Sequence, residues 1–352
     1  MRVLLTGAAG FIGGHIATCL LEAGHDVIAL DLLVNSAHGE DPTVPSGILR
    51  ADVRSPADLE GALAEVEVVC HQAAIVGAGV DISDAPAYAS HNDFGTAVLL
   101  AAMGRAGCRR LVLASSMVVY GDGAYRCEEH GLVRPGPRSI EDLDDGIFDP
   151  HCPECSSLLH WESVNESAPL RPRSLYAASK LAQESYAEAW TLACGGSATA
   201  LRYHNVYGEL MPRNTPYSGV AAMFRSSLER GQAPQVFEDG HQTRDFVNVA
   251  DIAAANRAAV EQPHSGFVPL NISSGIPITI GEVAAMLSKA RNGPAPQITG
   301  GYRPGDVRHI VADSTAATNL LGFRAQVHPD EGIAAFAGSP LRDASAAGPP
   351  RV

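Results

Sequence analysis

The chain has 352 residues, is 46% hydrophobic and 18% charged, and carries a formal net charge of −14. This apolar content is enough for a packed core and argues against general disorder. The strong negative charge excludes a nucleic acid or an anionic membrane as the main partner, because both require a basic face.

Short apolar strands and helices alternate through the first two thirds of the chain. The predicted strands cover residues 3–6, 27–30, 48–49, 66–70, 111–114 and 198–201. The predicted helices between them cover residues 11–23, 56–64, 86–106 and 175–193. This alternation predicts an α/β fold with a Rossmann-type, doubly wound parallel sheet.

A glycine-rich turn, Gly7-Ala8-Ala9-Gly10-Phe11-Ile12-Gly13, joins the first strand to the first helix. In this context glycines bind the pyrophosphate of a dinucleotide at a helix N-terminus. Gly7 permits the tight turn, Gly10 lets the backbone approach the pyrophosphate, and Gly13 allows close helix–strand packing.

Asp31 ends the second predicted strand, about 20 residues after the turn. A carboxylate there binds both ribose hydroxyls and repels a 2′-phosphate, which favours NAD over NADP. Asp52 and Val53, after the third strand, are candidates for the adenine edge.

The second half of the chain has helices near 217–230, 250–261 and 280–290, joined by Pro- and Gly-rich connections. This pattern is typical of a smaller C-terminal α/β lobe that binds substrate. The predicted domains are a NAD-binding Rossmann domain (1–205 and 241–275, with an insertion at 121–170), a substrate lobe (206–240 and 276–337) and a disordered tail (338–352). An insertion of this length is usually functional or has its own small fold.

Tyr176 and Lys180 lie one helical turn apart on the same face of the predicted helix 175–193. The ordinary pKa of tyrosine is about 10, and a nearby ammonium with an oxidised nicotinamide lowers it. Tyr176 then accepts a proton from a substrate hydroxyl while hydride leaves the carbon. Lys180 also holds the nicotinamide ribose, and Ser116 is the candidate to bond the reacting oxygen. A tyrosine–lysine pair alone is more often a surface pair; the glycine turn and the Ser115-Ser116 pair favour catalysis.

Over residues 1–335 the chain resembles the extended short-chain dehydrogenase/reductases that act on nucleotide sugars, the epimerase/dehydratase group. The resemblance rests on the glycine turn, Tyr176 with Lys180, and segments 71–74, 92–96, 115–121, 201–208, 240–246 and 302–306. The predicted NAD-binding set is Gly7, Gly10, Phe11, Ile12, Gly13, Asp31, Asp52, Val53, Gln72, Ala73, Ala74, Asn92, Ser115, Tyr176, Lys180, Tyr203 and His204. His204 departs from the family, which usually has Phe beside the nicotinamide.

The resemblance also implies a nucleotide-sugar substrate that lies across the lobe. Ser116 and Asn205 would contact its sugar and phosphate region, and Asp306 its nucleoside ribose. Arg244 and Arg303 would pair with the diphosphate, which suits planar guanidinium groups. The family further implies a homodimer through the helices near 92–106 and 175–193.

The reaction follows from which catalytic groups are present. The 4,6-dehydratase branch has an Asp-Glu pair directly after its catalytic Thr, but here Met117 and Val118 cannot move protons. The acidic residue of the decarboxylase branch is missing too. The set Ser116, Tyr176 and Lys180 predicts a 4-epimerase that oxidises C4, turns the ketosugar over and returns hydride to the other face with recycled NAD.

Within the family the chain most resembles dTDP-L-rhamnose 4-epimerases, so the predicted substrate is a dTDP-6-deoxyhexose such as dTDP-L-rhamnose. The cues are segments 214–220 and 237–240 and the insertion. A UDP-glucose or other UDP-hexose 4-epimerase and a 4-ketosugar reductase are alternatives. A non-catalytic NAD-sensing protein of the same fold is an alternative from another class.

Seven cysteines, an odd count, and no signal peptide or bilayer-spanning run predict reduced thiols in a cytoplasmic enzyme without a membrane partner. Cys127-x-x-His130 and Cys152-Pro-Glu-Cys155 have the ligand spacing of a tetrahedral structural zinc site. Idle thiols or a disulfide between Cys152 and Cys155 are the alternatives.

Overall fold

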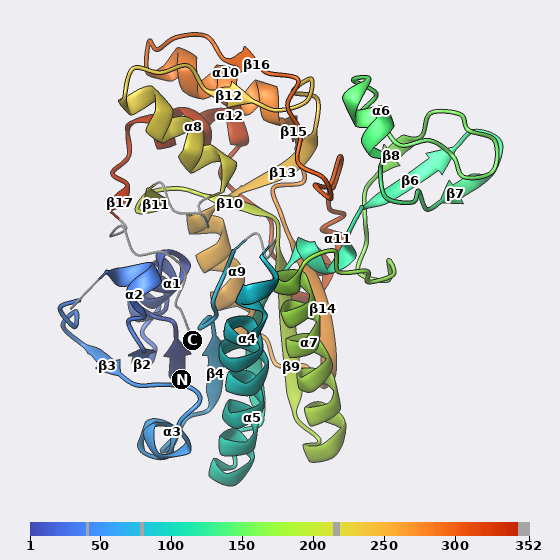
Figure 1. Cartoon of the computed structure of the whole chain (residues 1–352). Coiled ribbons are helices and arrows are strands. Elements are labelled where there is room, and N and C mark those ends of the chain that lie inside the picture. The colour runs from blue at the N-terminus through green and yellow to red at the C-terminus, as the bar shows by residue number, and fades with distance from the viewer. Residues whose placement is uncertain (40–41, 78–80, 214–218, 344–352) are drawn as a thin grey trace.

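A computed structural model of the chain describes residues 1–39, 42–77, 81–213 and 219–343. The strands of its main sheet are β1 (Arg2–Thr6), β2 (Asp26–Asp31), β3 (Ile48–Arg50), β4 (Val68–His71), β5 (Arg110–Ser116), β9 (Ser197–Tyr203) and β14 (Gly266–Ile272). All are parallel, in the order β14-β9-β5-β4-β1-β2-β3 (Figure 1). The order reverses between β1 and β4, where ligands bind in doubly wound sheets, outside the carboxyl ends of the strands. The predicted fold class is confirmed.

Helices cover both faces of this sheet because its apolar side chains alternate. Val3 and Leu5 pack into one core and Leu4 into the other. The first core holds helices α1 (Phe11–Glu22), α9 (Val249–Glu261) and α11 (Thr315–Leu321). The second holds α3 (Pro56–Ala62), α5 (Gly95–Ala106) and α7 (Leu175–Cys194).

The predicted helix 86–106 is built from three segments. They are α4 (Ala85–Tyr88), a π-helical turn η2 (Ala89–Phe94) and α5. A π turn inside a helix often marks a functional position. Here it contains the buried Asn92.

The C-terminal lobe, which the sequence predicts to bind substrate, lies above the sheet in Figure 1 and has its own apolar core. Its helices are α8 (Val220–Glu229), α10 (Ile280–Ala290) and α12 (Pro329–Gly338), with the strand pair β12 (Gln235–Val236) and β16 (Gln297–Ile298). Strands β10 (Asn205–Tyr207), β13 (Thr243–Asn248) and β15 (Pro277–Thr279) form a second small sheet. Phe224, Leu287 and Phe336 hold the three helices together.

The insertion forms a small fold that projects from the main body (Figure 1). Strands β6 (Ala124–Cys127), β7 (Gly131–Val133) and β8 (His160–Glu162) make an antiparallel sheet in the order β7-β6-β8. Helix α6 (Ile140–Asp144) follows β7, and the Ser139 side chain accepts a hydrogen bond from the Asp142 N–H at its start.

Two boundaries differ from the sequence prediction. Helix α11 packs on the Rossmann core through Ala317 and Leu321, although 276–337 was assigned to the lobe. Residues 338–343 are ordered, because β17 (Arg342–Asp343) pairs with β11 (Pro212–Arg213). Residues 344–352 of the predicted tail lie outside the described residues. The remaining short helices are α2 (Asn35–His38), η1 (Ile82–Asp84) and η3 (Met117–Tyr120). No helix in the described ranges is long and apolar enough to cross a membrane.

Candidate functional site

The glycine turn packs so closely that side chains do not fit at two of its positions. Gly7 has a φ of +70°, and a Cβ there would lie 2.7 Å from the Ala73 nitrogen. A Cβ on Gly13 would lie 2.0 Å from the Gly7 carbonyl oxygen. Gly10 begins α1 without a side-chain cap. The first N–H groups of α1, at Phe11 and Ile12, are therefore free of capping side chains, which fits a bound pyrophosphate.

Asp31 connects the end of β2 to this turn. Its carboxylate accepts hydrogen bonds from the Ala9 N–H at 2.9 Å and from the Leu33 N–H at 2.8 Å. His38 Nε2 lies 3.6 Å away. Each carboxylate oxygen has two lone pairs, so Asp31 keeps acceptor capacity for ribose hydroxyls while it orients the turn.

Arg342, on strand β17, also contacts the glycine turn. It donates hydrogen bonds to the Ala9 carbonyl at 2.6 Å and the Ala37 carbonyl at 3.2 Å. Sequence reasoning missed this residue because Arg342 and Ala9 are 333 positions apart. Its only sequence signal is an arginine within a segment predicted to be disordered.

The predicted adenine pair has protein partners. Asp52 forms a bidentate ion pair with Arg54, whose Nη1 also donates to the Ser90 hydroxyl. Val53 is buried in the apolar core with α5. Any contact from these residues to an adenine ring would come from backbone atoms or the edge of the Asp52 carboxylate.

The segment after β4 lies directly against the glycine turn, as the contact of Gly7 with Ala73 shows. The Ala73 N–H donates to Thr6 Oγ1 at 3.1 Å. The Gln72 side chain is held by Asn256 and by the Tyr203 hydroxyl, both at 3.0 Å. The Gln72 and Tyr203 side chains are therefore hydrogen-bonded to other protein groups. Ala73 and Ala74 are the positions of this segment that border the glycine turn.

Asn92 was predicted to contact the cofactor, but its amide is fully used by the protein. It accepts from the Ile75 N–H at 2.8 Å, and donates to the Ile75 carbonyl and the Ser179 hydroxyl, each at 2.9 Å. The side chain is completely buried, and its three hydrogen bonds fix the segment after β4 against α7.

Ser116, Tyr176 and Lys180 come together at the carboxyl end of β5. The Ser116 side chain lies beside the Tyr176 phenol and lowers its pKa. Lys180 donates from Nζ to the Ala114 carbonyl at 2.9 Å, and this Nζ lies 6.0 Å from the centroid of the Tyr176 ring. The predicted serine, tyrosine and lysine thus occupy one corner of the sheet.

The electrostatics of this corner differ from the sequence-based expectation. Burial raises the pKa of Tyr176 above its ordinary value, the neighbouring Tyr88 raises it further, and the Ser116 side chain opposes this. Burial lowers the pKa of Lys180 to about 8, although Glu184 acts in the opposite direction. Lys180 is directed at a backbone carbonyl rather than at the phenol, so it does not offset the effect of burial.

A buried ion pair behind these residues was not predicted. Glu184 of α7 pairs with Arg202 of β9 through two hydrogen bonds, at 3.0 and 2.7 Å, and both side chains are at most 3% exposed. The Ser115 hydroxyl donates to the same carboxylate. Ser115 was predicted to bind the cofactor, but its hydroxyl is committed to Glu184. Arg202 also donates to the Tyr120 hydroxyl at 2.9 Å, which ties η3 to the strand.

The predicted substrate residues of the lobe come from β10 (Asn205), β13 (Arg244) and the turn 303–306. The Asn205 side-chain oxygen is buried without a hydrogen-bond partner among the described residues. Arg244 donates to the carbonyls of Thr243 and Arg308, both at 2.9 Å, and to that of Val307. Arg303 is exposed, with its guanidinium carbon 5.1 Å from the centroid of the Phe237 ring.

Asp306 closes a turn with Arg303, donating its N–H to the Arg303 carbonyl at 3.1 Å. Burial raises the pKa of Asp306, and the positive charge of Arg303 opposes this. The predicted ribose ligand and one predicted diphosphate ligand therefore belong to a single turn.

His204 is 3% exposed, and neither ring nitrogen reaches a hydrogen-bond partner in the described part of the chain. Burial lowers the pKa of His204 to about 3, although a contact with Asn271 opposes this. The ring is therefore neutral, which makes it closer to the Phe of the family than its residue type indicates.

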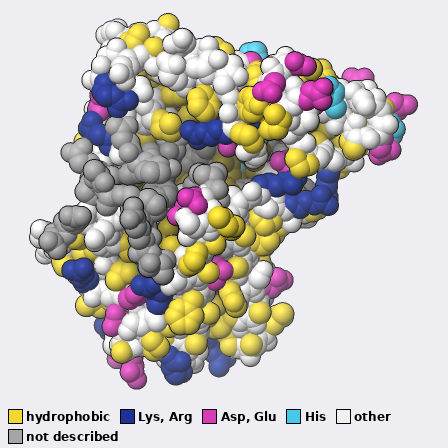
Figure 2. Space-filling model, in the orientation of Figure 1, with side chains coloured by type: hydrophobic (Ala, Val, Ile, Leu, Met, Phe, Trp, Pro, Cys, Tyr) yellow, Lys and Arg dark blue, Asp and Glu magenta, His cyan; other side chains and the backbone are white. Residues whose placement is uncertain are grey.

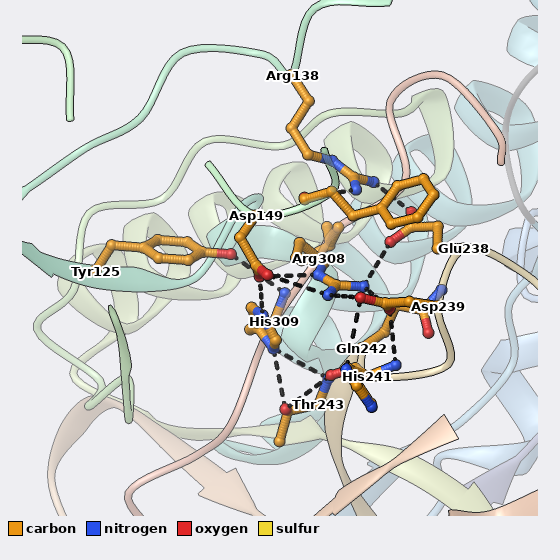
Figure 3. Close-up of polar contacts among 12 residues, drawn as sticks. Tyr125, Arg138, Asp149, Glu238, Asp239, His241, Gln242, Thr243, Arg308 and His309 are labelled. Carbon is orange, nitrogen blue, oxygen red and sulfur yellow. Dashed lines mark hydrogen bonds and ion pairs between the residues drawn. The ribbon is translucent and has the colours of Figure 1, made fainter. Parts of the chain in front are cut away.

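The insertion is attached to the lobe by the polar network in Figure 3. Arg308, 2% exposed, pairs with Asp149 at 3.0 Å, Glu238 at 2.9 Å and Asp239 at 2.6 Å. Asp149 also accepts from His309 Nε2 at 2.8 Å. Sequence reasoning missed this network. Its sole trace in the sequence is the presence of charged residues in the insertion, at 238–239 and at 308.

Further contacts lead from this network to the turn 303–306. The Tyr125 hydroxyl accepts from the His309 N–H at 3.2 Å. Arg138 pairs with Glu238 at 2.8 Å and donates to the Asp306 carbonyl at 2.7 Å. The insertion thus contacts the segment that carries Arg303 and Asp306.

The four predicted metal ligands of the insertion also come together. The ligand atoms of Cys127, His130, Cys152 and Cys155 all lie within 4.8 Å of one another. All seven cysteines are free, so the predicted alternative of a Cys152–Cys155 disulfide is not formed.

Comparison with known proteins gives consistent matches. A family model described as "NAD dependent epimerase/dehydratase family" matches residues 3–139 and 156–273. The chain is 31% identical over 341 residues to a dTDP-L-rhamnose 4-epimerase of Burkholderia thailandensis, covering 94% of this chain and 93% of that protein. It is 33% identical over 346 residues to a UDP-glucose 4-epimerase of Mycolicibacterium smegmatis, covering 95% and 96%.

Among solved structures, the fold is similar to a UDP-glucose 4-epimerase of Thermus thermophilus in complex with NAD. The TM-score is 0.74 and the identity 31%, with 97% of this chain and 100% of that chain covered. The likeness thus extends over the Rossmann domain and the lobe together.

Proposed function

This chain belongs to the NAD-dependent epimerase/dehydratase family, and we propose that it is a nucleotide-sugar 4-epimerase acting on a dTDP-linked 6-deoxyhexose such as dTDP-L-rhamnose. Near-complete coverage of relatives named as 4-epimerases supports the reaction class. The observation that carries the assignment is the corner at β5, where Ser116 contacts Tyr176 and Lys180 is fixed beside them.

In this proposal Tyr176 accepts the proton of the C4 hydroxyl and later returns it. Ser116 holds the reacting oxygen at the phenol. Lys180 fixes the end of β5, which carries Ser116, against the helix that carries Tyr176. NAD, when bound at the glycine turn and Asp31, supplies the hydride acceptor and donor. The close packing at Gly7 and Gly13 and the uncapped start of α1 fit its pyrophosphate.

The two residues directly after Ser116 cannot transfer protons, which supports epimerisation over elimination. Met117 and Val118 begin η3, which links β5 to the insertion. A dehydratase needs an acid and a base at the sugar ring to remove water. A set reduced to the Ser116, Tyr176 and Lys180 corner suits oxidation at C4 and its reversal on the other face.

Two features support an anionic nucleotide sugar on the lobe. Arg303 is exposed and stacked on Phe237, so its guanidinium is available to a diphosphate. The Asn205 oxygen is buried and has no partner among the described residues, a state that a ligand donor would relieve. These groups give local binding to a dianion despite the net charge of −14.

The proposed dTDP-6-deoxyhexose rests on the Burkholderia relative and on segment 237–240. The long insertion 121–170 is a further cue, and residues 214–218 of the third cue, segment 214–220, lie outside the described residues. A UDP-hexose 4-epimerase is the second candidate, because the Mycolicibacterium relative is equally complete. A panel of dTDP- and UDP-sugars, followed by NMR of the C4 configuration, tests the choice. Faster turnover of UDP-galactose than of every dTDP-6-deoxyhexose would assign the chain to the second candidate.

We also propose a homodimer through α5 and α7. Large apolar side chains are exposed on these elements, with Leu192 of α7 83%, Tyr186 of α7 46% and Phe94, just before α5, 56% exposed. Light scattering at micromolar concentration checks the mass. A monomer at all concentrations would contradict this part of the proposal without affecting the reaction.

A further inference from the structure

We propose that Cys127, His130, Cys152 and Cys155 bind one structural zinc ion, which holds the insertion in the shape that attaches it to the substrate lobe. The proposal starts from distances. Cys127 Sγ lies 3.6 Å from Cys155 Sγ and 3.6 Å from His130 Nδ1, and Cys152 Sγ lies 3.7 Å from His130 Nδ1.

These distances match the edges of a zinc tetrahedron. With Zn–S about 2.3 Å and Zn–N about 2.0–2.1 Å, tetrahedral geometry gives edges of about 3.8 Å between sulfurs and about 3.6 Å between sulfur and nitrogen. A disulfide would instead bring two sulfurs to about 2.05 Å, and the 3.6 Å between Cys127 and Cys155 excludes one there.

Two tight turns present the ligands. In the first, Cys127 pairs with Gly131 at the end of the β6–β7 hairpin, and Gly131 has a φ of +69°. In the second, the Cys152 N–H donates to the Ser157 carbonyl at 2.7 Å, and the Ser156 N–H to the Cys152 carbonyl at 2.9 Å. Each turn folds back so that its two ligands face the same point.

The donor set selects zinc. Three thiols and one imidazole are soft to borderline ligands, which exclude calcium and magnesium and suit a closed tetrahedral site. His130 faces the sulfurs with Nδ1, while its Nε2 lies 3.7 Å from the Glu154 carboxylate. A carboxylate behind a ligating histidine orients the ring and fixes its tautomer.

The insertion needs such a centre because its own core is small. Its buried apolar cluster consists of Tyr125, Val133 and Leu159 together with Cys127 and Cys152, and two of these five are themselves proposed ligands. A core this small rarely stabilises a fold alone, and a bound metal then supplies folding free energy.

The site differs from the common core of the family. The family model matches residues up to 139 and again from 156, so Cys152 and Cys155 lie in the segment it leaves out. The surface over the insertion also carries acidic side chains, among them Glu128 (91% exposed) and Glu154 (61% exposed) (Figure 2). This charge opposes nucleic-acid binding. The ion has a structural role because four protein ligands leave no open coordination position.

The zinc site is linked through the insertion to the turn 303–306, which carries the predicted substrate ligands Arg303 and Asp306. Tyr125, two residues before Cys127, contacts His309, and Arg138 contacts Asp306. Loss of the ion therefore loosens the turn that carries Arg303. This consequence rests on the proposed function: removal of the zinc ion should raise KM for the nucleotide sugar severalfold, while the NAD content stays unchanged.

Metal analysis of the full chain, purified without chelator, tests the proposal directly. We expect about one zinc per chain in the parent protein and loss of most of it in His130→Ala and Cys152→Ser. The matched controls are His160→Ala, with a side chain 73% exposed on β8, and Cys194→Ser at the end of α7. Both controls keep the zinc.

A second measurement covers the case in which the ligand variants do not fold. Metal-stripped parent protein is titrated with Co²⁺, and thiolate-to-cobalt charge-transfer absorption with tetrahedral ligand-field bands is expected at one equivalent. Zinc below a tenth of an equivalent after reconstitution, or no such bands, overturns the proposal. Zinc content is independent of turnover, so this failure is distinguishable from failure of the proposed epimerase activity.

Discussion

Lys180 donates a hydrogen bond from Nζ to the carbonyl oxygen of Ala114, at 2.9 Å, and so joins α7 to the strand that ends in Ser116. The lysine therefore holds the helix that carries Tyr176 in register with the serine. Its effect on the phenol is positional in this structure, since burial still raises the pKa of Tyr176. The positive charge of an oxidised nicotinamide ring is the remaining contribution that favours the phenolate.

Tyr176→Phe removes the proposed proton acceptor and keeps the ring. We expect turnover to fall by about 10²–10⁴-fold, the usual contribution of a general base. Bound NAD and the affinity for the nucleotide sugar remain near the parent values, measured by absorbance after denaturation and by calorimetry. Tyr186→Phe, on the same helix, is the control, because it removes a hydroxyl away from the catalytic corner and keeps the apolar ring of the proposed dimer interface. Near-normal turnover in Tyr176→Phe would show that another group is the base.

Lys180 predicts a specific dependence of stability on pH. Its folded pKa, about 8, lies below its ordinary value of 10.5, so the unfolded chain binds more protons between these values. The free energy of unfolding therefore rises with pH in this window, by up to about 3 kcal/mol. Lys180→Met removes this rise, and urea unfolding of NAD-free protein at several pH values compares the two. Parallel curves would contradict the prediction.

The sheet and the catalytic corner could be predicted because their signals are local. A glycine turn between strand and helix, and a tyrosine and lysine four positions apart, specify their own geometry. Ser115 and Asn92 show the limit of such patterns. Both were predicted to contact the cofactor, yet their side chains are used by Glu184 and by Ile75 and Ser179.

Long-range polar contacts could not be predicted at all. The partners of Arg202 lie on helix α7 and on η3, and those of Arg342 near the other end of the chain. A buried arginine has the same sequence signature as a surface one. Its partner is determined by the packing of elements that meet only in the folded chain.

Glu184→Gln tests the buried ion pair. The substitution leaves Arg202 buried with an uncompensated charge, which typically costs about 3–5 kcal/mol. Urea unfolding of the variant measures the loss, and Glu188→Gln, exposed on the same helix, is the control with little expected change. A loss below about 1 kcal/mol would mean that the neutral amide and Tyr120 satisfy Arg202.

Arg342→Ala tests the contact of the C-terminal strand with the glycine turn. The variant loses one hydrogen bond to the Ala9 carbonyl in the glycine turn and one to the Ala37 carbonyl in α2, each contributing about 1 kcal/mol. We expect NAD affinity to fall by about tenfold or more and copurified NAD to decrease accordingly. Arg324→Ala, an exposed arginine after α11, keeps the parent NAD content. Unchanged NAD in Arg342→Ala would restrict the arginine to holding β17.

Arg303→Ala tests substrate binding by the lobe. Arg303 is exposed, and among the residues that the structure describes no carboxylate lies within ion-pair distance of it. Its removal therefore has little effect on folding, and the loss falls on the diphosphate. A charge-assisted bidentate contact contributes about 1.5–3 kcal/mol, so KM for the nucleotide sugar should rise by about 10–100-fold with kcat changed less. The salt dependence of KM should weaken in the variant, because a screened charge pair is lost. Arg230→Ala, exposed at the end of α8, should change neither quantity. If KM stayed constant while the free energy of unfolding fell, Arg303 would act through its stacking on Phe237 rather than through the substrate.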